Sequence, residues 1–303
     1  MILRPRPHWV RMLFVLRGTV LPAIAPQLLV ATGFAAIVTL LHSPLVGWKL
    51  SLNIVPFSLI GLVMAIFLGF RNSTSYARYW EARTLWGAVL NETRTLVRQA
   101  LTLVDAPEQA RPLAMRLSAF VHALRHQLRG SDPTPDLARL LPCDDCHRLA
   151  PARFQPALLL LMAGEWIGQR RRDGSLDPVL VPTLEQPLGK LSQALGGCER
   201  ISSTPIPFAY SVLIHRTIYF YCLLLPFGLV DTIGAMTPVI VAFIAYTFLA
   251  LESLAVELEE PFGTSPNDLA LDAISHMIES TLREMLGETL PPPRDRAVDY
   301  IET

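Results

Sequence analysis

The sequence is short of charge. Asp, Glu, Lys and Arg make up only 17% of its 303 residues, whereas soluble domains usually carry about 25%. The 26 basic and 26 acidic side chains cancel, so no global excess of positive charge points to nucleic acid. The chain also lacks a Gly-rich phosphate loop, a nucleophile elbow and a carboxylate pair within an apolar run. These absences remove the common signals of enzymes, and we expect neither catalysis nor a cofactor.

Long uncharged runs are abundant instead. The mean hydropathy is +0.37, and 51% of the residues are hydrophobic. Since about 20 apolar residues cross a bilayer as a helix, the sequence predicts four spans, at about 21–41, 56–70, 211–230 and 237–251. The run at 18–48 is too long for the core of a signal peptide, so we interpret it as a retained span. No alternation typical of strands and no internal repeat is present. The expected fold is an all-α integral membrane protein.

The distribution of arginines predicts the topology. Arg4, Arg6, Arg11 and Arg17 precede the first span, and the region 71–210 is rich in Arg. The loop between the first and second spans carries one Lys, and the loop between the third and fourth spans carries one Asp. Because basic loops stay in the cytoplasm, we expect both termini and the middle region there. The segments are then 1–20 (N-terminal), 21–70 (two spans), 71–210 (cytoplasmic helices), 211–257 (two spans) and 258–303 (C-terminal helix and tail).

Helical periodicity continues outside the predicted spans. The second span should run on as one helix, and further helices are predicted at 116–129, 156–170, 182–200 and 269–286, the last capped by Asp268. A turn and loop are expected at 130–136. The acidic side chains where the fourth span ends are interpreted as a solvated helix end: Glu252, Glu257, Glu259 and Glu260.

Two parallel stripes mark the second span. Leu62, Ile66 and Phe70 are four residues apart and form one apolar ridge on a helix. The small residues Gly61, Ala65 and Gly69 form a second ridge beside it, and small residues at this spacing let helices approach closely in a membrane. The pattern fits either a helix buried in a bundle or a helix that lines a narrow, dry pore.

One short motif points to a different class of protein. Cys143, Cys146 and His147 form Cys-x-x-Cys-His, which is the attachment signature of c-type haem and also half of a zinc site. The predicted cytoplasmic location argues against haem, and the second half of a zinc site is missing. We interpret the segment as a surface loop with reduced thiols, and keep a membrane-anchored metal or haem protein as an alternative.

Three segments resemble the bestrophin family, in particular its bacterial homologues. They are FLGFRNSTSYARYWEARTLWG at 67–87, ISSTPIPFAYSVLIHRTIYFYCLLLPFGLVD at 201–231 and LEEPFGTSPNDLAL at 258–271. The entry to the first span, Arg17-Gly18-Thr19, also fits. The resemblance covers almost the whole chain and is weakest over 100–169.

The resemblance implies a homopentameric ion channel of the bacterial inner membrane, with four spans per subunit. In this family the second span lines a hydrophobic neck, and the neck positions fall on Leu62, Ile66 and Phe70 of this sequence. A second constriction, the cytoplasmic aperture, lies about 25 positions before the Ile-Pro-Phe-Ala-Tyr motif. That count gives Leu180, with Val179 and Val181 as its neighbours. The implied partners are further copies of the chain, monovalent ions and lipid, without nucleic acid.

Calcium regulation and ion type separate this sequence from the animal members. Their run of acidic calcium ligands after Pro-Phe-Gly is reduced here to Asp268. Because calcium needs six to eight oxygens, we expect no such calcium site.

The ion type also differs within the family. Animal members conduct anions, whereas bacterial members favour monovalent cations. We therefore favour cations. A chloride channel is the alternative, because Arg71 just past the neck would favour anions if it faced the pore. A transporter would show inverted repeats or charges at mid-membrane, and neither is present.

Overall fold

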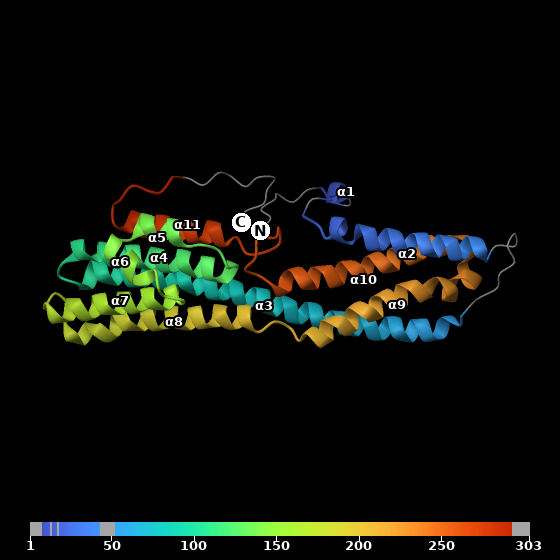
Figure 1. Cartoon of the computed structure of the whole chain (residues 1–303), viewed down its shortest axis with the longest axis horizontal. Coiled ribbons are helices and arrows are strands. Elements are labelled where there is room, and N and C mark those ends of the chain that lie inside the picture. The colour runs from blue at the N-terminus through green and yellow to red at the C-terminus, as the bar shows by residue number, and fades with distance from the viewer. Residues whose placement is uncertain (1–7, 13, 17, 43–51, 293–303) are drawn as a thin grey trace. The chain divides into compact units, whose positions relative to one another are not determined.

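The computed structural model describes residues 8–12, 14–16, 18–42 and 52–292, and leaves the side chain of Arg11 out. The arginines at 4, 6 and 17, the Lys in the first outer loop and the end of the tail lie outside these residues. Within them, every regular element is helical (Figure 1). The helices are α1 (Trp9–Met12), α2 (Leu21–Leu41), α3 (Ile54–Leu103), α4 (Ala110–Arg129), α5 (Thr134–Leu140), α6 (Cys143–Leu149), α7 (Gln155–Arg172), α8 (Val181–Ser203), α9 (Phe208–Ile233), α10 (Thr237–Glu259) and α11 (Leu271–Met285), with short 3-10 turns η1 (Pro107–Gln109), η2 (Pro178–Leu180) and η3 (Gly234–Met236).

The chain divides into two compact units. The apolar unit is formed within 5–79 and 205–260, and the charged unit within 80–204 and 261–303. Helix α3 contributes its first part to the apolar unit and its last part to the charged unit. Each unit therefore combines segments that are distant in sequence.

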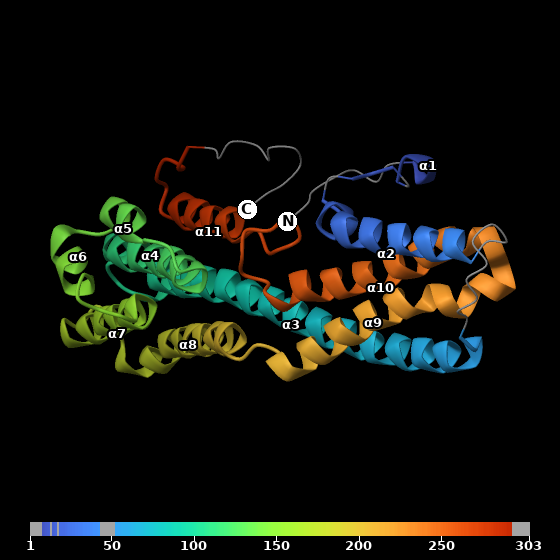
Figure 2. The same ribbon diagram turned by 45° about the vertical axis from the view of Figure 1, so that its right-hand side comes forward.

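The apolar unit contains α2, the start of α3, α9 and α10, which lie side by side in both ribbon views (Figures 1 and 2). Its core combines side chains of all four helices, including Ala35, Leu68, Ile218 and Val241. Three helical stretches of the described residues are long and apolar enough to cross a membrane: Leu21–Leu41, Ile54–Leu103 and Phe208–Glu259, the last comprising α9, η3 and α10. The helices predicted for the four apolar runs are confirmed, and the second does continue without a break.

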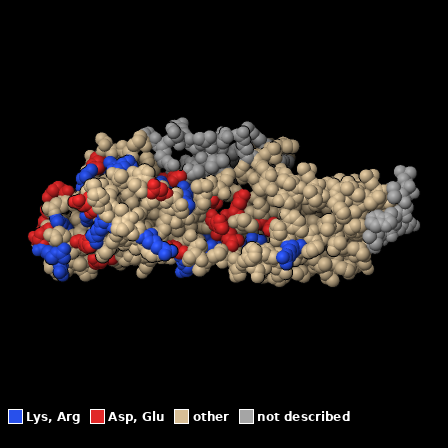
Figure 3. All heavy atoms as spheres, in the orientation of Figure 1, with Lys and Arg blue, Asp and Glu red and all other residues tan. Residues whose placement is uncertain are grey.

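The charged unit packs α4 against α7, α8 and α11. Its core includes Trp86 from α3 and Phe120 from α4, both fully buried. The helices predicted at 116–129, 156–170, 182–200 and 269–286 are confirmed with longer or slightly shifted bounds. Charged side chains gather on the surface over α4 to α8, whereas the surface over α2, α9 and α10 is mostly uncharged (Figure 3).

Two segments that we expected to be loops are partly or wholly helical. Gly130, at φ +61°, ends α4 as a turn residue, but Thr134 already begins α5. Asp132 Oδ1 accepts hydrogen bonds from the Thr134 backbone N–H and hydroxyl, which starts this helix. The Cys143–His147 motif lies in α6 rather than in a loop. Acidic residues in its first turn and His147 in its last turn suit the helix dipole, a local signal that favours the helix.

The predicted cap of the last helix is also wrong. Helix α11 begins at Leu271, with Ala270 at its N-cap position. Asp268 is buried and its Oδ2 accepts a hydrogen bond from the Ser265 backbone N–H at 2.7 Å. The carboxylate therefore closes the turn that precedes α11.

Candidate functional site

The apolar stripe of α3 is the exposed face of that helix. Leu62, Ile66 and Phe70 are 61%, 50% and 65% exposed in the protomer. A helix advances about 100° per residue, so these three side chains lie opposite Met64 and Leu68, which are 5% and 1% exposed. One face of α3 is thus fixed by packing inside the apolar unit, and the face with the stripe is left for contacts outside the protomer.

The small-residue stripe changes its environment along α3. A Cβ atom added to Gly61 would lie 2.9 Å from the Tyr221 hydroxyl oxygen of α9, whereas one added to Gly69 would meet no atom within 4 Å. Residues spaced by four drift about 40° around a helix per step, which carries the stripe from the packed face at Gly61 toward the exposed face at Gly69. Ala65, between them, is exposed.

Space is left directly behind the stripe. A cavity of about 210 Å³ lies between α3 and α9 and is lined almost entirely by apolar side chains: Val63, Met64, Phe67, Leu68, Leu213, Ile214, Thr217 and Ile218. Side chains at this interface therefore have room to change rotamer without displacing the helix.

Arg71, next to the last residue of the stripe, points into the apolar unit. Its side chain is 2% exposed, with NH1 3.9 Å from Glu252 Oε1 and NH2 3.6 Å from Glu259 Oε2. Within the described residues its Nε and NH1 donors have no hydrogen-bond partner. The neighbouring Asn72 amide donates to the Leu251 carbonyl at 3.2 Å and holds α3 against α10 at the same level.

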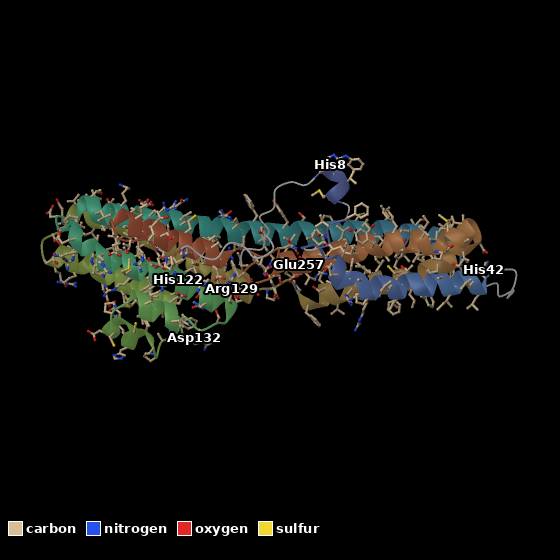
Figure 4. All side chains as sticks on the ribbon, turned by 90° about the horizontal axis from the view of Figure 1, so that it is seen from above. His8, His42, His122, Arg129, Asp132 and Glu257 are labelled. Carbon is tan, nitrogen blue, oxygen red and sulfur yellow. The ribbon has the colours of Figure 1, made fainter. Side chains whose placement is uncertain are left out.

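Both carboxylates that face Arg71 have further polar partners. Glu252 Oε1 lies 2.9 Å from His215 Nδ1 on α9, and Glu259 Oε1 accepts a hydrogen bond from the Ile206 backbone N–H at 3.0 Å. The interpretation of these residues as a solvated helix end is therefore wrong for Glu252 and Glu259. Figure 4 labels Glu257 in the same region of α10.

Sequence reasoning missed this ion-paired cluster, although a local signal was present. The last turn of α10 carries glutamates and no basic residue. Carboxylates at a helix C-terminus are disfavoured by the helix dipole, so their presence indicates a positive partner elsewhere in the fold. Arg71 directly follows the apolar run that ends at Phe70, but its helix phase alone could not assign the pair.

The predicted aperture residue lies at a tight turn. Leu180 ends η2 and directly precedes α8. The turn is held by Asp177 Oδ1, which accepts a hydrogen bond from the Val179 backbone N–H at 2.9 Å. Val179 is 80% exposed, while Leu180 and Val181 are half-buried. The structure gives this segment a defined conformation, and the role of Leu180 remains a prediction.

The Cys-x-x-Cys-His motif does not converge on one point. Cys143 Sγ lies 3.7 Å from His147 Nε2, one helical turn away, whereas Cys146 Sγ is directed to the Leu137 carbonyl at 3.6 Å. In the described part of the chain, no group of three or more His, Cys, Asp or Glu side chains could hold a metal ion. Burial raises the pKa of Cys146, with the negative charges of Cys143 and Asp145 adding to it, so the thiol form is favoured.

A second polar network lies in the core of the charged unit, where Figure 4 labels His122 and Arg129 of α4. Burial alone would raise the pKa of Glu279, but hydrogen bonds from Arg139 and His122 outweigh it and hold the pKa well below its usual range. Burial likewise acts to raise the pKa of Asp136, yet its hydrogen bond with His126 and the charges of His122 and Arg125 lower that pKa to about 2. Both carboxylates are thus held in the ionised form.

Comparison with known proteins identifies the family. The family model described as bacterial and fungal bestrophin protein matches residues 1–284. The chain belongs to the bestrophin family. The resemblance of the three segments is confirmed, and it extends over the weakly similar middle region.

Relatives of this bestrophin are named as channel-forming proteins. The voltage-dependent anion channel-forming protein RSc3414 of Ralstonia nicotianae is 50% identical over 291 residues, covering 95% of each chain. YneE of Escherichia coli, with the same description, is 42% identical over 294 residues, covering 97% of each. A crystal structure of a bacterial bestrophin homologue from Klebsiella pneumoniae matches with a TM-score of 0.84 and 44% identity, covering 88% of this chain and 99% of that one. These matches support an ion channel and carry no enzyme name.

Proposed function

We propose that this bestrophin is an ion channel in which five copies of the chain surround a central pore. The observation that carries the proposal is the exposed face of α3. Its three large apolar side chains, Leu62, Ile66 and Phe70, are exposed on a helix whose opposite face is packed. A ring of such helices, one from each subunit, would bring these stripes together around one axis.

The proposed neck acts through its poor affinity for water. Rings of apolar side chains hold water weakly, so a narrow neck gates by dewetting and by rotation of side chains, without a charged plug. The cavity between α3 and α9 is lined by Val63 and Phe67, which adjoin the stripe residues in the chain, and gives these two side chains space to rotate. Leu180 forms the proposed aperture at the cytoplasmic end of the pathway. Because apolar walls distinguish anions from cations only weakly, selectivity must come from charges elsewhere.

We place the apolar unit in the bilayer of the inner (plasma) membrane. Its four spans are α2, the start of α3, α9 and α10, and the charged unit and both termini are cytoplasmic. The scarcity of charge over α2, α9 and α10 supports this placement (Figure 3). So do the three helical stretches Leu21–Leu41, Ile54–Leu103 and Phe208–Glu259, each of which is long and apolar enough to cross a membrane.

We favour conduction of monovalent cations. Arg71, the basic residue next to the neck, is buried against α10 and balanced by two carboxylates. It therefore presents no free positive charge that would attract anions. The alternative is an anion channel, as the names of the relatives suggest.

The test is the reversal potential of the purified protein in planar bilayers under asymmetric KCl and then asymmetric NaCl. Discrete currents that reverse near the cation equilibrium potential support the proposal in full. Reversal near the chloride potential retains the channel and assigns it to anions. Absence of current from a preparation shown to be pentameric by mass, both for the wild type and for variants with a widened neck, would contradict the channel.

A further inference from the structure

We infer that Glu252 and Glu259 are specificity-determining residues that, together with Arg71, place a net negative charge at the inner end of the neck and bias the channel toward cations. This inference rests on the proposed function, and it adds the residues responsible for ion choice. None of the three belongs to the apolar stripe. Arg71 follows Phe70 directly in α3, so the cluster lies at the level where the stripe ends.

The three side chains form a fixed unit. Arg71 is 2% exposed and lies between Glu252 at 3.9 Å and Glu259 at 3.6 Å. Each carboxylate is held from its other side, by His215 Nδ1 at 2.9 Å and by the Ile206 backbone N–H at 3.0 Å. These distances keep both negative charges at defined positions beside the end of the neck.

The charges of the cluster do not cancel. One guanidinium faces two carboxylates, which leaves one negative charge per subunit while His215 is neutral. Helices α3, α9 and α10 of the apolar unit show the same excess of acidic side chains near this cluster. In residues 52–79 and 205–260 the only basic side chains besides the histidine are Arg71, Arg78 and Arg216, against four glutamates at the end of α10: Glu252, Glu257, Glu259 and Glu260.

The position of Glu257 and Glu259, in the last turn of α10, works against helix stability, which argues for another role. Carboxylates near a helix C-terminus meet the negative end of the helix dipole. Here Arg78 compensates, because its Nε donates to the Glu259 backbone carbonyl at 3.3 Å and so satisfies one of the terminal acceptors of α10. The fold therefore retains negative charge at this end and supplies a basic side chain to stabilise it.

Buried charges near a pore act on permeating ions at a distance. In an environment of low dielectric constant, a fixed charge is screened much less than one on an open surface. Clefts with low-dielectric walls also concentrate the field of the charges that line them and raise the local concentration of counter-ions. Five clusters around one axis would add their fields at the inner mouth of the neck, attract cations and repel anions.

The experiment compares cation-to-anion permeability ratios of full-length variants in planar bilayers under asymmetric KCl. Glu252→Gln and Glu259→Gln keep the shape of the side chain and remove its charge, so each should lower the ratio several-fold. The double variant Arg71→Gln/Glu259→Gln removes one charge of each sign and leaves the net charge of the cluster unchanged. It should restore a ratio close to that of the wild type after Glu259→Gln alone has lowered it. If the single variant acted by disturbing the structure, removing Arg71 as well would not restore the ratio.

Glu108→Gln is the matched control, because Glu108 is an exposed residue of η1 in the charged unit, and it should leave the ratio unchanged. If Glu252→Gln and Glu259→Gln both conduct ions with the wild-type permeability ratio, the two glutamates do not determine ion choice, and the proposed channel function still holds. A wild-type protein selective for anions would overturn the assignment of the glutamates as well. A wild type without current in the same bilayers would overturn the proposed function, and the assignment with it.

Discussion

His122 Nε2 lies 2.9 Å from Glu279 Oε2, and this pair joins α4 to α11 across 157 positions of the sequence. Both side chains are almost fully buried, with 5% and 1% exposed. Arg139 from α5 donates to the two oxygens of the same carboxylate at 2.5 and 2.8 Å. One glutamate thus connects three helices of the charged unit, and the stability of this unit should depend on its ionisation.

We expect acid to unfold the charged unit progressively. The pKa of Glu279 is lowered from 4.5, and that of Asp136 is lowered from 3.8 to about 2. A carboxylate with a lowered pKa stabilises the fold at pH values above its unfolded pKa, and this contribution is lost as the pH falls through the folded value. The melting temperature should therefore hold above about pH 5 and fall steadily toward about pH 2. Tryptophan fluorescence can report the transition, because Trp86 of the charged unit is fully buried and becomes exposed on unfolding.

The matched variant for this prediction is Glu279→Gln. It removes one of the two carboxylates that face His122 and Arg139 and leaves only Asp136 beside them. Breaking a buried pair costs up to about 3–5 kcal/mol of unfolding free energy. The variant should melt earlier at neutral pH and lose part of the acid dependence. An acid profile identical to that of the wild type would show that Glu279 does not carry it.

Gly61→Ala should destabilise the apolar unit. The new Cβ would lie 2.9 Å from the Tyr221 hydroxyl oxygen, and overpacking of this kind costs about 1–3 kcal/mol. Adding Tyr221→Phe removes the clashing oxygen, after which the nearest ring atom of that side chain is 3.5 Å away. The double variant should recover most of the lost melting temperature in detergent. If it melts as early as Gly61→Ala alone, the close approach of α3 and α9 is not the cause.

Gly69→Ala provides the comparison on the same stripe. No atom of the protomer lies within 4 Å of the added Cβ, so the protomer itself should tolerate the change. In the proposed pentamer the exposed end of the stripe packs between subunits, and the variant should then reduce the pentamer fraction in size-exclusion chromatography with mass detection. An unchanged pentamer fraction would place Gly69 outside the contacts between subunits.

Removal of metal should leave the protein unchanged. Structural zinc takes four ligands, and the motif in α6 brings together only Cys143 and His147. Thiolates bind metal better than thiols, and the raised pKa of Cys146 disfavours its thiolate. Dialysis against EDTA should not alter the melting temperature, and elemental analysis should find less than one zinc per chain. Stoichiometric zinc in the purified protein would contradict this prediction.

The long helices could be predicted from sequence because their signals are local. The length of each apolar run and the period of its side chains lie within one segment, and they specified α2, the start of α3, α9 and α10 closely. The short helices α5 and α6 have only 7 residues each, too few to be stable alone. They depend on contacts with distant residues, such as the ion pair of Asp145 with Arg116 at 2.9 Å, which no local pattern reveals.

In the candidate site, too, the features within one helix could be predicted from sequence, whereas the contacts between distant residues could not. The spacing of Leu62, Ile66 and Phe70 defined the stripe, because one helix period is sufficient to place them on one face. The partners of Arg71 are 181 and 188 positions away, and its helix phase left it free to face a lumen or a neighbouring helix. Only the packing of α3 against α10 distinguishes these two arrangements.

The neck itself is tested by Leu62→Ala, Ile66→Ala and Phe70→Ala. Each variant shortens one apolar ring of the proposed pentamer, so the neck becomes wider, holds water more easily and admits ions more often. Single-channel recordings should show an open probability several-fold higher than that of the wild type. Ile60→Ala is the matched control, since this side chain is 42% exposed on the same helix but lies about 120° around it from Ile66. If all three neck variants conduct as the wild type does, or if the control gains as much, the stripe does not form the neck.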